Sequence, residues 1–468
     1  MHFLMERYIQ FIFFFAILFS VFGFMQWFVI RSYIRWLART VSAHAFHRFR
    51  SAGLIFFALA NILFILRFPS TEMGWYQHPL FQALVIYPGG IFFGAVVLAF
   101  ILLVAISAGS GLLSLSRRAW HRFNEQTSTG TMPSAVQTAA PEASSPSDAA
   151  LSPATATASH TSGSGSKGTT AITGSTGTTV AAGATGIPGL SRRQFLRTAG
   201  TALATAPVAF TIGASAATAH DYQINRLRLH YPGLPSGLEG LRIVQLSDIH
   251  SGIYMTETQM RDIFHLANEQ NPDLVAITGD FVDNSPSEIP ALYRALPDLK
   301  SEYGVFGCLG NHDHYASAPM VASALRQQGV QVLTNDSRTL RVNDEPLTLL
   351  GVDDIESRST NELRFGQAVQ NVPQDSFRIL LSHRPDLFDN ARMQGIDLTL
   401  AGHTHGGQIG FEIMGVPLYP IHLFHDYAKG LYEIGGSKLY VNVGIGMVGV
   451  PVRLVRPELT VIELTSRA

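Results

Sequence analysis

The chain contains little charge and almost no cysteine. Asp, Glu, Lys and Arg make up 14% of its 468 residues, against roughly 25% in an average soluble domain. The formal net charge is −1, so nothing in the charge balance indicates a nucleic-acid partner. The single cysteine, Cys308, excludes an intramolecular disulfide framework and any metal site built from several cysteines. Because 47% of the residues are hydrophobic, the shortage of charge predicts membrane segments, an uncharged polar tract, or both.

Residues 1–122 have the composition of a membrane region. Residues 8–30 carry no charge and are numerous enough to cross a hydrocarbon core of roughly 30 Å. Residues 52–66 and 81–113 are also apolar, with Pro88-Gly89-Gly90 as a kink or start in the third run. We therefore expect about three transmembrane helices, although the short second run would also suit a buried helix of a soluble domain.

Residues 123–190 consist mainly of Ser, Thr, Ala and Gly, with few large apolar side chains. Such a segment cannot bury enough surface to offset the entropy lost on ordering. It is therefore predicted to be a disordered linker.

Residues 191–219 resemble a twin-arginine export signal, which would form a fourth membrane segment. Ser191-Arg192-Arg193 and Phe195-Leu196-Arg197 match the core of such signals, and a mildly apolar, Ala- and Thr-rich stretch follows. The alternative is a helix that happens to be flanked by positive charge. Small residues ending at Ala219 would suit cleavage there, which the sequence leaves open.

The distribution of arginine predicts the topology. The loop after the first apolar run carries five arginines and no acid, and three more arginines follow the third run. By the positive-inside rule, that loop and the linker are cytoplasmic. A crossing at 191–219 would then place residues 220–468 outside the cytoplasm. We expect a multi-pass inner-membrane protein that engages the twin-arginine translocase during export.

Residues 220–468 have the pattern of one α/β domain. Strand-length apolar runs occur at 242–246, 274–278, 305–309, 347–352, 379–382, 398–401, 439–443 and 460–464. Helices are predicted after the capping box Thr256/Gln259, at 291–296 and at 319–328. The order is β-α-β-α-β followed by a strand-rich half, which fits two packed sheets with helices outside.

Five polar blocks follow these runs: SDIHSG at 247–252, TGDFVD at 278–283, GNHDHY at 310–315, LSHRPD at 381–386 and AGHTHGGQ at 401–408. The first three recur at the length of a strand-helix-strand unit, roughly 30 residues. They should therefore share one edge of a parallel sheet, where open α/β sheets bind their ligands.

The residue types in these blocks predict a metal centre. In an extended segment, residues i and i+2 point the same way, so Asp248 and His250 can face one cation, as can His403 and His405. Carboxylates, imidazoles and an amide without thiolate suit Mn, Fe, Zn, Co or Ni. One such histidine would be an ordinary core residue, but five such blocks at strand ends indicate a site.

The blocks resemble the calcineurin-like metallophosphoesterases, whose pattern is Asp-x-His, Gly-Asp, Gly-Asn-His-Asp/Glu, a lone His and Gly-His-x-His. The HTHGGQ motif and the segment 440–446 are similar to exported or membrane-bound bacterial members and to transmembrane proteins with a metallophosphoesterase domain. The resemblance covers roughly residues 242–464. It implies a four-layer α-β-β-α metallophosphoesterase sandwich behind an α-helical membrane region.

The resemblance also implies two divalent metal ions, with Mn, Fe or Zn expected. The first metal would be held by Asp248, His250, Asp280 and His405. The second would be held by Asp280, Asn311, His383 and His403.

Three further residues receive roles. His312 would contact the phosphate and act as general acid, and Asp313 would orient it. Arg384 is a candidate for phosphate binding, with a solvated surface arginine as the alternative.

The implied activity is hydrolysis of a phosphate mono- or diester outside the cytoplasm, with a lipid-linked ester as one substrate class. Two divalent cations outweigh the two ligand carboxylates, and the remaining positive charge suits a phosphate ester. A function of another class stays open, namely a membrane sensor or scaffold whose phosphoesterase fold only binds.

Overall fold

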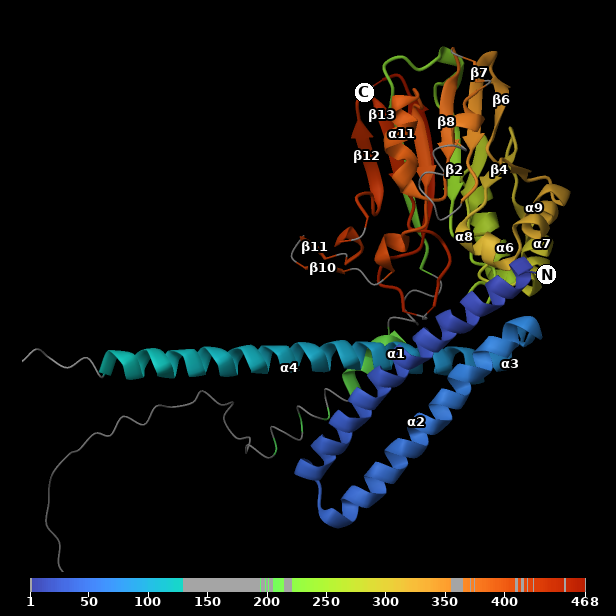
Figure 1. The fold of residues 1–468 in the computed structure, drawn as a ribbon. Helices are drawn as coiled ribbons and strands as arrows, with labels where there is room; N and C mark the ends of the chain where they lie inside the picture. The colour runs from blue at the N-terminus through green and yellow to red at the C-terminus, as the bar shows by residue number, and fades with distance from the viewer. Residues whose placement is uncertain are drawn as a thin grey trace, which may run out of the picture. The chain divides into compact units, whose positions relative to one another are not determined.

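The computed structural model describes residues 2–128, 205–213, 221–354 and 365–467, the last range with gaps of one or two residues, and three isolated positions between 194 and 201 (Figure 1). The chain divides into two compact units, Met1–Ala105 with Phe195–Ala468, and Ile106–Gln194. The predicted linker from residue 129 onward, the Arg192-Arg193 pair and the segment 217–219 lie outside the described residues.

The N-terminal part is helical. Its helices are α1 (His2–Thr40), α2 (Ala43–Glu72), α3 (Pro79–Phe81) and α4 (Tyr87–Ser128). Among the residues that the structure describes, two stretches are long and apolar enough to cross a membrane, Ala43–Arg67 and Pro79–Arg117. The first predicted span, residues 8–30, lies within α1, where the side chains before residue 17 are outside the description. Pro88 is the second residue of α4, which continues directly from α3 and the π-helical turn Gln82–Ile86. It therefore lies inside a helical run, where a proline and a π-helical turn are usual causes of a kink.

The C-terminal part contains two six-stranded sheets and a small hairpin. The first sheet has the order β1-β14-β2-β3-β4-β5, with β1 (Gln223–His230), β2 (Arg242–Leu246), β3 (Leu274–Thr278), β4 (Val305–Cys308), β5 (Gln331–Val332) and β14 (Glu458–Thr465). The second has the order β12-β13-β9-β8-β7-β6, with β6 (Asp336–Val342), β7 (Glu345–Gly351), β8 (Phe377–Leu381), β9 (Leu398–Ala401), β12 (Gly430–Ile434) and β13 (Ser437–Val441). The hairpin pairs β10 (Phe411–Ile413) with β11 (Val416–Leu418).

Alternation along the strands explains the layers. In β3, Leu274 and Ala276 belong to the core between the two sheets, whereas Val275 and Ile277 belong to the core under the helices. Those helices are α6 (Glu257–Asn268), α7 (Ile289–Ala295) and α9 (Ala318–Gln327). On the outer face of the second sheet, α11 (Phe388–Met393) contributes to a third core. The arrangement is the expected α-β-β-α sandwich (Figure 1).

The parallel strands bring the polar blocks to one edge. β2 pairs with β3 and β3 with β4, all parallel, with Leu246 opposite Ile277 and Thr278 opposite Cys308. The strands β8 and β9 are likewise parallel in the second sheet. The segments after these five strands therefore leave the two sheets at their carboxyl ends, as the spacing predicts.

A candidate metal centre

The structure brings all seven predicted metal ligands together. Three overlapping groups of His and Asp side chains have ligand atoms within 4.8 Å of one another: Asp248/His250/His405, His250/Asp280/His312 and Asp280/His383/His403. Asn311 joins the third group through its side-chain oxygen, which lies 3.2 Å from Nε2 of His383. Asp280 belongs to two groups, so it is the side chain that links the two halves of the site.

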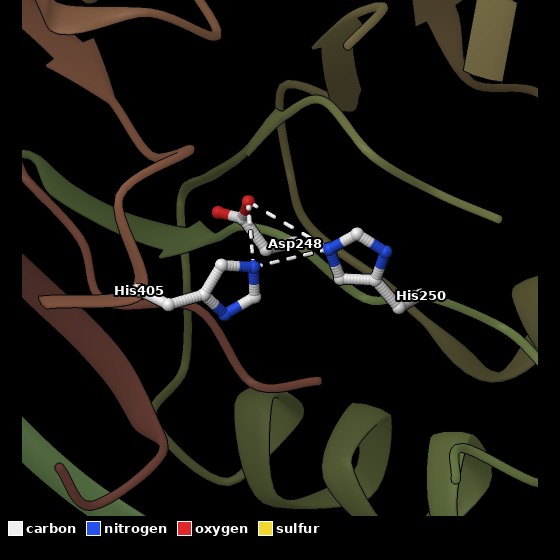
Figure 2. Close-up of side chains that lie close together, drawn as sticks. All are labelled: Asp248, His250 and His405. Carbon is white, nitrogen blue, oxygen red and sulfur yellow. Dashed lines mark hydrogen bonds and ion pairs between the residues drawn. The ribbon is translucent and has the colours of Figure 1, made fainter. Parts of the chain in front are cut away.

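The first half is built by Asp248, His250 and His405 (Figure 2). Nε2 of His250 lies 3.2 Å from Nε2 of His405, and Oδ1 of Asp248 lies 3.9 Å and 3.5 Å from these two atoms. Oδ2 of Asp280 approaches Nε2 of His250 to 3.6 Å. Four potential ligand atoms from three separate loops therefore converge.

The second half is built around His383. Its Nε2 lies 3.2 Å from Oδ2 of Asp280 and 3.1 Å from Nδ1 of His403. Its Nδ1 lies 2.9 Å from the carbonyl oxygen of Thr278. A carbonyl can only accept, so Nδ1 carries a proton, and Nε2 is the ring atom that faces the group.

The ligand loops have an unusual backbone. Asp248, His250, Asp280, His403 and His405 all have positive φ, between 48° and 71°, a region that few residues other than glycine adopt. The i, i+2 rule for extended segments was therefore wrong for His403 and His405, which point into different halves of the site. Such strain costs roughly 1–3 kcal/mol per residue and tends to gather at functional sites.

The donor set fits divalent metal ions. Ligand atoms about 2.1 Å from one ion lie roughly 3.0–3.4 Å from one another, and the ligand pairs described above are separated by 3.1–3.9 Å. His250 and His405 direct Nε2 toward each other, and the buried carboxylates of Asp248 and Asp280 lie beside this pair. Two buried carboxylates repel each other unless a cation lies between them, so the geometry is that of a cation site.

Burial and charge act against each other at the bridging residue. Although burial disfavours its charged form, the imidazoles of His383, His312 and His250 hold the pKa of Asp280 well below its usual range. Burial opposes protonation of His383 too, but Asp280 and Asp248 raise its pKa to about 10. Asp280 is therefore ionised, as a bridging ligand must be.

His312 lies beside both halves of the site. Its Nδ1 contacts the carbonyl oxygen of Asp283 and lies 3.5 Å from the carboxylate of the same residue. Despite burial, Asp283 and Asp280 raise the pKa of His312 to about 9. With the Nδ1 proton donated to a carbonyl, Nε2 is left for a substrate.

Asp313 was expected to orient His312, but its described hydrogen bonds are to backbone amides. Its carboxylate accepts from the backbone amides of Phe281, Val282 and Gly310 at 2.9–3.2 Å. It therefore joins the loop after β3 to the start of α8 (Asn311–Ala316), and the described hydrogen bond and ion pair of the His312 ring are with Asp283 instead.

Arg384 is fixed at the outer side of the second half. Its Nε donates to both oxygens of Asp354 at 2.9 Å and 3.1 Å, and Nη1 lies 3.1 Å from Nε2 of His403. The side chain of Asp354 is 2% exposed. The arginine is thus held at the site rather than spread on the surface.

Arg453 is fully buried in the loop after β13, and Asp248 is among the charged groups near it. Its guanidinium donates four hydrogen bonds to backbone carbonyls of that loop, those of Val443, Gly444, Gly446 and Val455. The guanidinium of Arg453 therefore joins residues 443–446, at the start of the loop, to Val455 near its end.

The loop held by Arg453 also supports the first half of the site. The amide of Gly446 donates to the carbonyl of Asp248 at 2.8 Å, and that of Ile445 donates to the carbonyl of Ser247 at 3.0 Å. A Cβ on Gly444 would lie 2.7 Å from Cβ of Asp248. This loop therefore packs directly against a ligand.

Sequence reasoning missed Asp283, Asp354 and Arg453. Asp283 ends the TGDFVD block and could have been found there, because a second carboxylate follows the ligand by three residues. The other two stand in segments without a chemical motif, and only the fold brings them to the site.

Comparisons with known proteins agree with the site. A family model described as calcineurin-like phosphoesterase matches residues 241–407. The uncharacterized metallophosphoesterase YkuE of Bacillus subtilis is 33% identical over 292 residues, which cover 59% of this chain and 98% of that protein. The chain belongs to the calcineurin-like metallophosphoesterases.

Two other members of the family are similar to this chain over about half of its length. An uncharacterized metallophosphoesterase of Aquifex aeolicus is 30% identical over 247 residues, covering 51% of this chain and 90% of its own length. The transmembrane protein with metallophosphoesterase domain of Danio rerio is 34% identical over 248 residues, or 49% of this chain. The chain covers only 54% of that relative. Family membership points to divalent-metal binding and phosphoester hydrolysis, and the two apolar helices point to membrane association.

Proposed function

We propose that the chain is a dinuclear metal-dependent phosphoesterase that hydrolyses a phosphate mono- or diester outside the cytoplasm. The observation that carries the proposal is Oδ2 of Asp280, which lies 3.6 Å from Nε2 of His250 and 3.2 Å from Nε2 of His383. One carboxylate oxygen thus faces two separate groups of ligands. This arrangement suits a pair of ions that share a ligand.

Seven side chains would hold the ions, in the two sets that Asp280 joins. When bound, two divalent cations supply Lewis-acid polarisation of the phosphoryl oxygens and lower the pKa of water. The ligand atoms are neutral imidazoles, an amide and two carboxylates, so the loaded site keeps positive charge for an anionic ester.

The remaining groups act on the substrate. His312, protonated at neutral pH, can donate from Nε2 to the leaving oxygen, and Asp283 holds its ring. Arg384, fixed by Asp354, can bind a phosphate oxygen at the side of His403. Asp313 keeps the loop carrying Asp280 in place through three backbone hydrogen bonds.

The extracytoplasmic location is supported by the arginine distribution and by the export-like segment 191–219. The match to YkuE covers 59% of this chain, which is more than the share taken by residues 220–468. The match therefore extends into the segment before residue 220. A reporter fused after Leu464 tests the location, with alkaline phosphatase compared with green fluorescent protein. Export that is abolished in Arg192→Lys/Arg193→Lys, and in cells without the twin-arginine translocase, would support the proposal. A fluorescent, phosphatase-negative fusion would contradict it.

Activity is tested on the full chain in detergent with Mn²⁺, using p-nitrophenyl phosphate and its bis-ester. We expect hydrolysis that is lost with EDTA and in Asp280→Ala. Hydrolysis that survives both treatments would refute the proposal. Metal binding without hydrolysis of any ester would favour the sensor or scaffold function instead.

A further inference from the structure

Arg67 connects the membrane helices to the metal centre. It is the last residue of the candidate span Ala43–Arg67 and is 7% exposed. Its Nη2 donates to the hydroxyl of Tyr254 and, at 3.2 Å, to the carbonyl of Gly449. The guanidinium carbon lies 5.3 Å from the centre of the Tyr254 ring. Burial of a cation costs several kcal/mol, and Nε of Arg67 is buried without a hydrogen-bond partner. The two bonds from Nη2 and the Tyr254 ring therefore compensate the buried charge, and all three are made with the phosphoesterase domain.

Apolar side chains enclose this contact. Tyr76, from the segment between the two candidate spans, and Ile86, in the first turns of the span Pro79–Arg117, are fully buried in one cluster with Tyr254. Ile253 and Met447 pack against the same cluster. The segment after Arg67 therefore covers two loops of the phosphoesterase domain, one before α6 and one after β13.

Both of these loops come directly from the metal centre. Tyr254 is four residues after the ligand His250, a stretch that spans at most roughly 14 Å. Gly449 is three residues after Gly446, whose amide donates to the carbonyl of Asp248 at 2.8 Å. The ligands of the first half therefore lie a short way from the end of an apolar span.

The segment between the spans and the start of the second span also have exposed apolar side chains. Met73 and Trp75 in the segment are 59% and 45% exposed, and Leu80 at the start of the span is 64% exposed. Trp is typical of the membrane–water interface. The headgroup layer adds roughly 5–8 Å on each side of the hydrocarbon core. The short loops span at most roughly 14 Å, a distance over which the metal centre could reach a phosphate group in that layer.

We propose that Arg67 docks the two metal-centre loops onto the end of the second membrane helix and thereby holds the centre at the bilayer surface, where it acts on phosphate esters anchored in the membrane. The substrate class rests on the proposed phosphoesterase function, whereas the docking does not. The docking also requires residues 67–87 and 220–468 to lie on the same side of the membrane. The span Pro79–Arg117 has 39 residues, more than the roughly 20 that a crossing needs, so the part after residue 87 suffices to cross.

Cross-linking tests the docking without any assay of activity. In a Cys308→Ala background, Tyr87→Cys and Met447→Cys are paired, because both side chains pack against the cluster of Tyr76, Ile86 and Tyr254 and both leave the partners of Arg67 in place. A protease site inserted between Gly163 and Ser164 lets cleavage separate the two halves unless a short bis-maleimide joins them. The control pair is Tyr87→Cys with Met393→Cys, on α11 and 68% exposed. We expect the first pair alone to remain joined; equal or no joining would overturn the docking.

The substrate class is tested with the full chain in phosphatidylcholine nanodiscs. Hydrolysis of phosphatidic acid in the disc is compared with that of p-nitrophenyl phosphate in solution. We expect Arg67→Leu and Tyr254→Phe to lower the ratio of the two rates about tenfold, with the soluble rate within about twofold. The control is Arg50→Leu, an exposed position of α2. Equal loss on both esters, or no hydrolysis of the anchored ester by the wild type, would overturn this inference; no hydrolysis of either would instead refute the phosphoesterase function.

Discussion

Replacement of Arg453 by Met should destabilise the phosphoesterase domain far more than an ordinary loss of charge. The guanidinium is fully buried and donates four hydrogen bonds to backbone carbonyls. Burial lowers its pKa to about 10, against the effect of Asp248 and Glu458, so the cation persists at neutral pH. Methionine fills a similar volume but leaves the carbonyls of Val443, Gly446 and Val455 without a described donor, whereas that of Gly444 still accepts from the amide of Glu458 at 3.1 Å.

The magnitude follows from two opposing contributions. Each buried acceptor left without a partner costs about 1–3 kcal/mol. Removal of a buried cation returns several kcal/mol of desolvation cost. We expect a net loss of about 2–5 kcal/mol in the free energy of unfolding. In a domain of this size 1 kcal/mol shifts Tm by roughly 2–4 °C, so Tm should fall by about 5–15 °C.

The assay is thermal unfolding of the full chain in detergent with EDTA, which removes the contribution of bound metal. The control is Arg456→Met, three residues away. Arg456 forms an ion pair with Asp221 at 2.5 Å, but both side chains are about half exposed, and such pairs contribute about 0–1 kcal/mol. If Arg453→Met unfolds within about 2 °C of Arg456→Met, the loop is not held by the buried guanidinium and the reasoning fails.

Three further substitutions test the site. Against the effect of burial, Asp283 helps to raise the pKa of His312 to about 9, so Asp283→Asn should move the alkaline limb of the pH profile of kcat/KM to lower pH; an unmoved limb would count against His312 as the acid. Asp354→Asn should raise KM about tenfold with a smaller change in kcat, because Arg384 loses the partner that fixes it; an unchanged KM would remove Arg384 from the substrate site. Glu288 is buried shortly after the loop that carries Asp280. Burial first, and then the charge of Asp283, raises the pKa of Glu288 to about 8. The stability contributed by the neutral carboxyl group is therefore complete below about pH 4.5 and is lost as the pH rises through about 8. Glu288→Gln should therefore show a flatter dependence of Tm on pH between 5 and 8, and parallel curves would contradict this.

The central strands and the convergence of the candidate ligands could be predicted from the sequence because both leave local patterns. β2, β3 and β9 begin and end at the predicted residues, since strands buried on both faces appear as continuous apolar runs between polar blocks. The ligands stand directly after such strands. A parallel sheet brings the carboxyl ends of its strands to one edge, so residues that are distant in the sequence could be grouped without a structure.

The edge strands could not be predicted in this way. β1 contains Arg226 and Arg228 among its apolar residues, and in β6 only Val342 is fully buried. A strand exposed on one side needs few apolar residues, so its pattern is weak. Each of these segments is a strand because it pairs with a neighbouring strand. That pairing depends on the tertiary fold.

The partners of the ligands depend even more on the fold. Asp354 and Arg384 lie 30 positions apart, and their ion pair forms because β7 and β8 are parallel neighbours. Arg453 recognises only backbone carbonyls, which no sequence pattern encodes. The positive φ angles of His403 and His405 likewise reflect the crowding of loops at the sheet edge, and they reversed the expectation drawn from residue spacing.

The most direct test of the central claim is a titration of Mn²⁺ into the metal-free full chain, with bound metal and hydrolysis of bis-p-nitrophenyl phosphate measured in the same samples. The account predicts two bound ions per chain and activity that appears as the second ion binds. In Asp280→Ala, whose shared ligand is lost, both the second equivalent and the activity should disappear. Full hydrolysis with no bound metal, or two tightly bound ions in Asp280→Ala with wild-type activity, would contradict it.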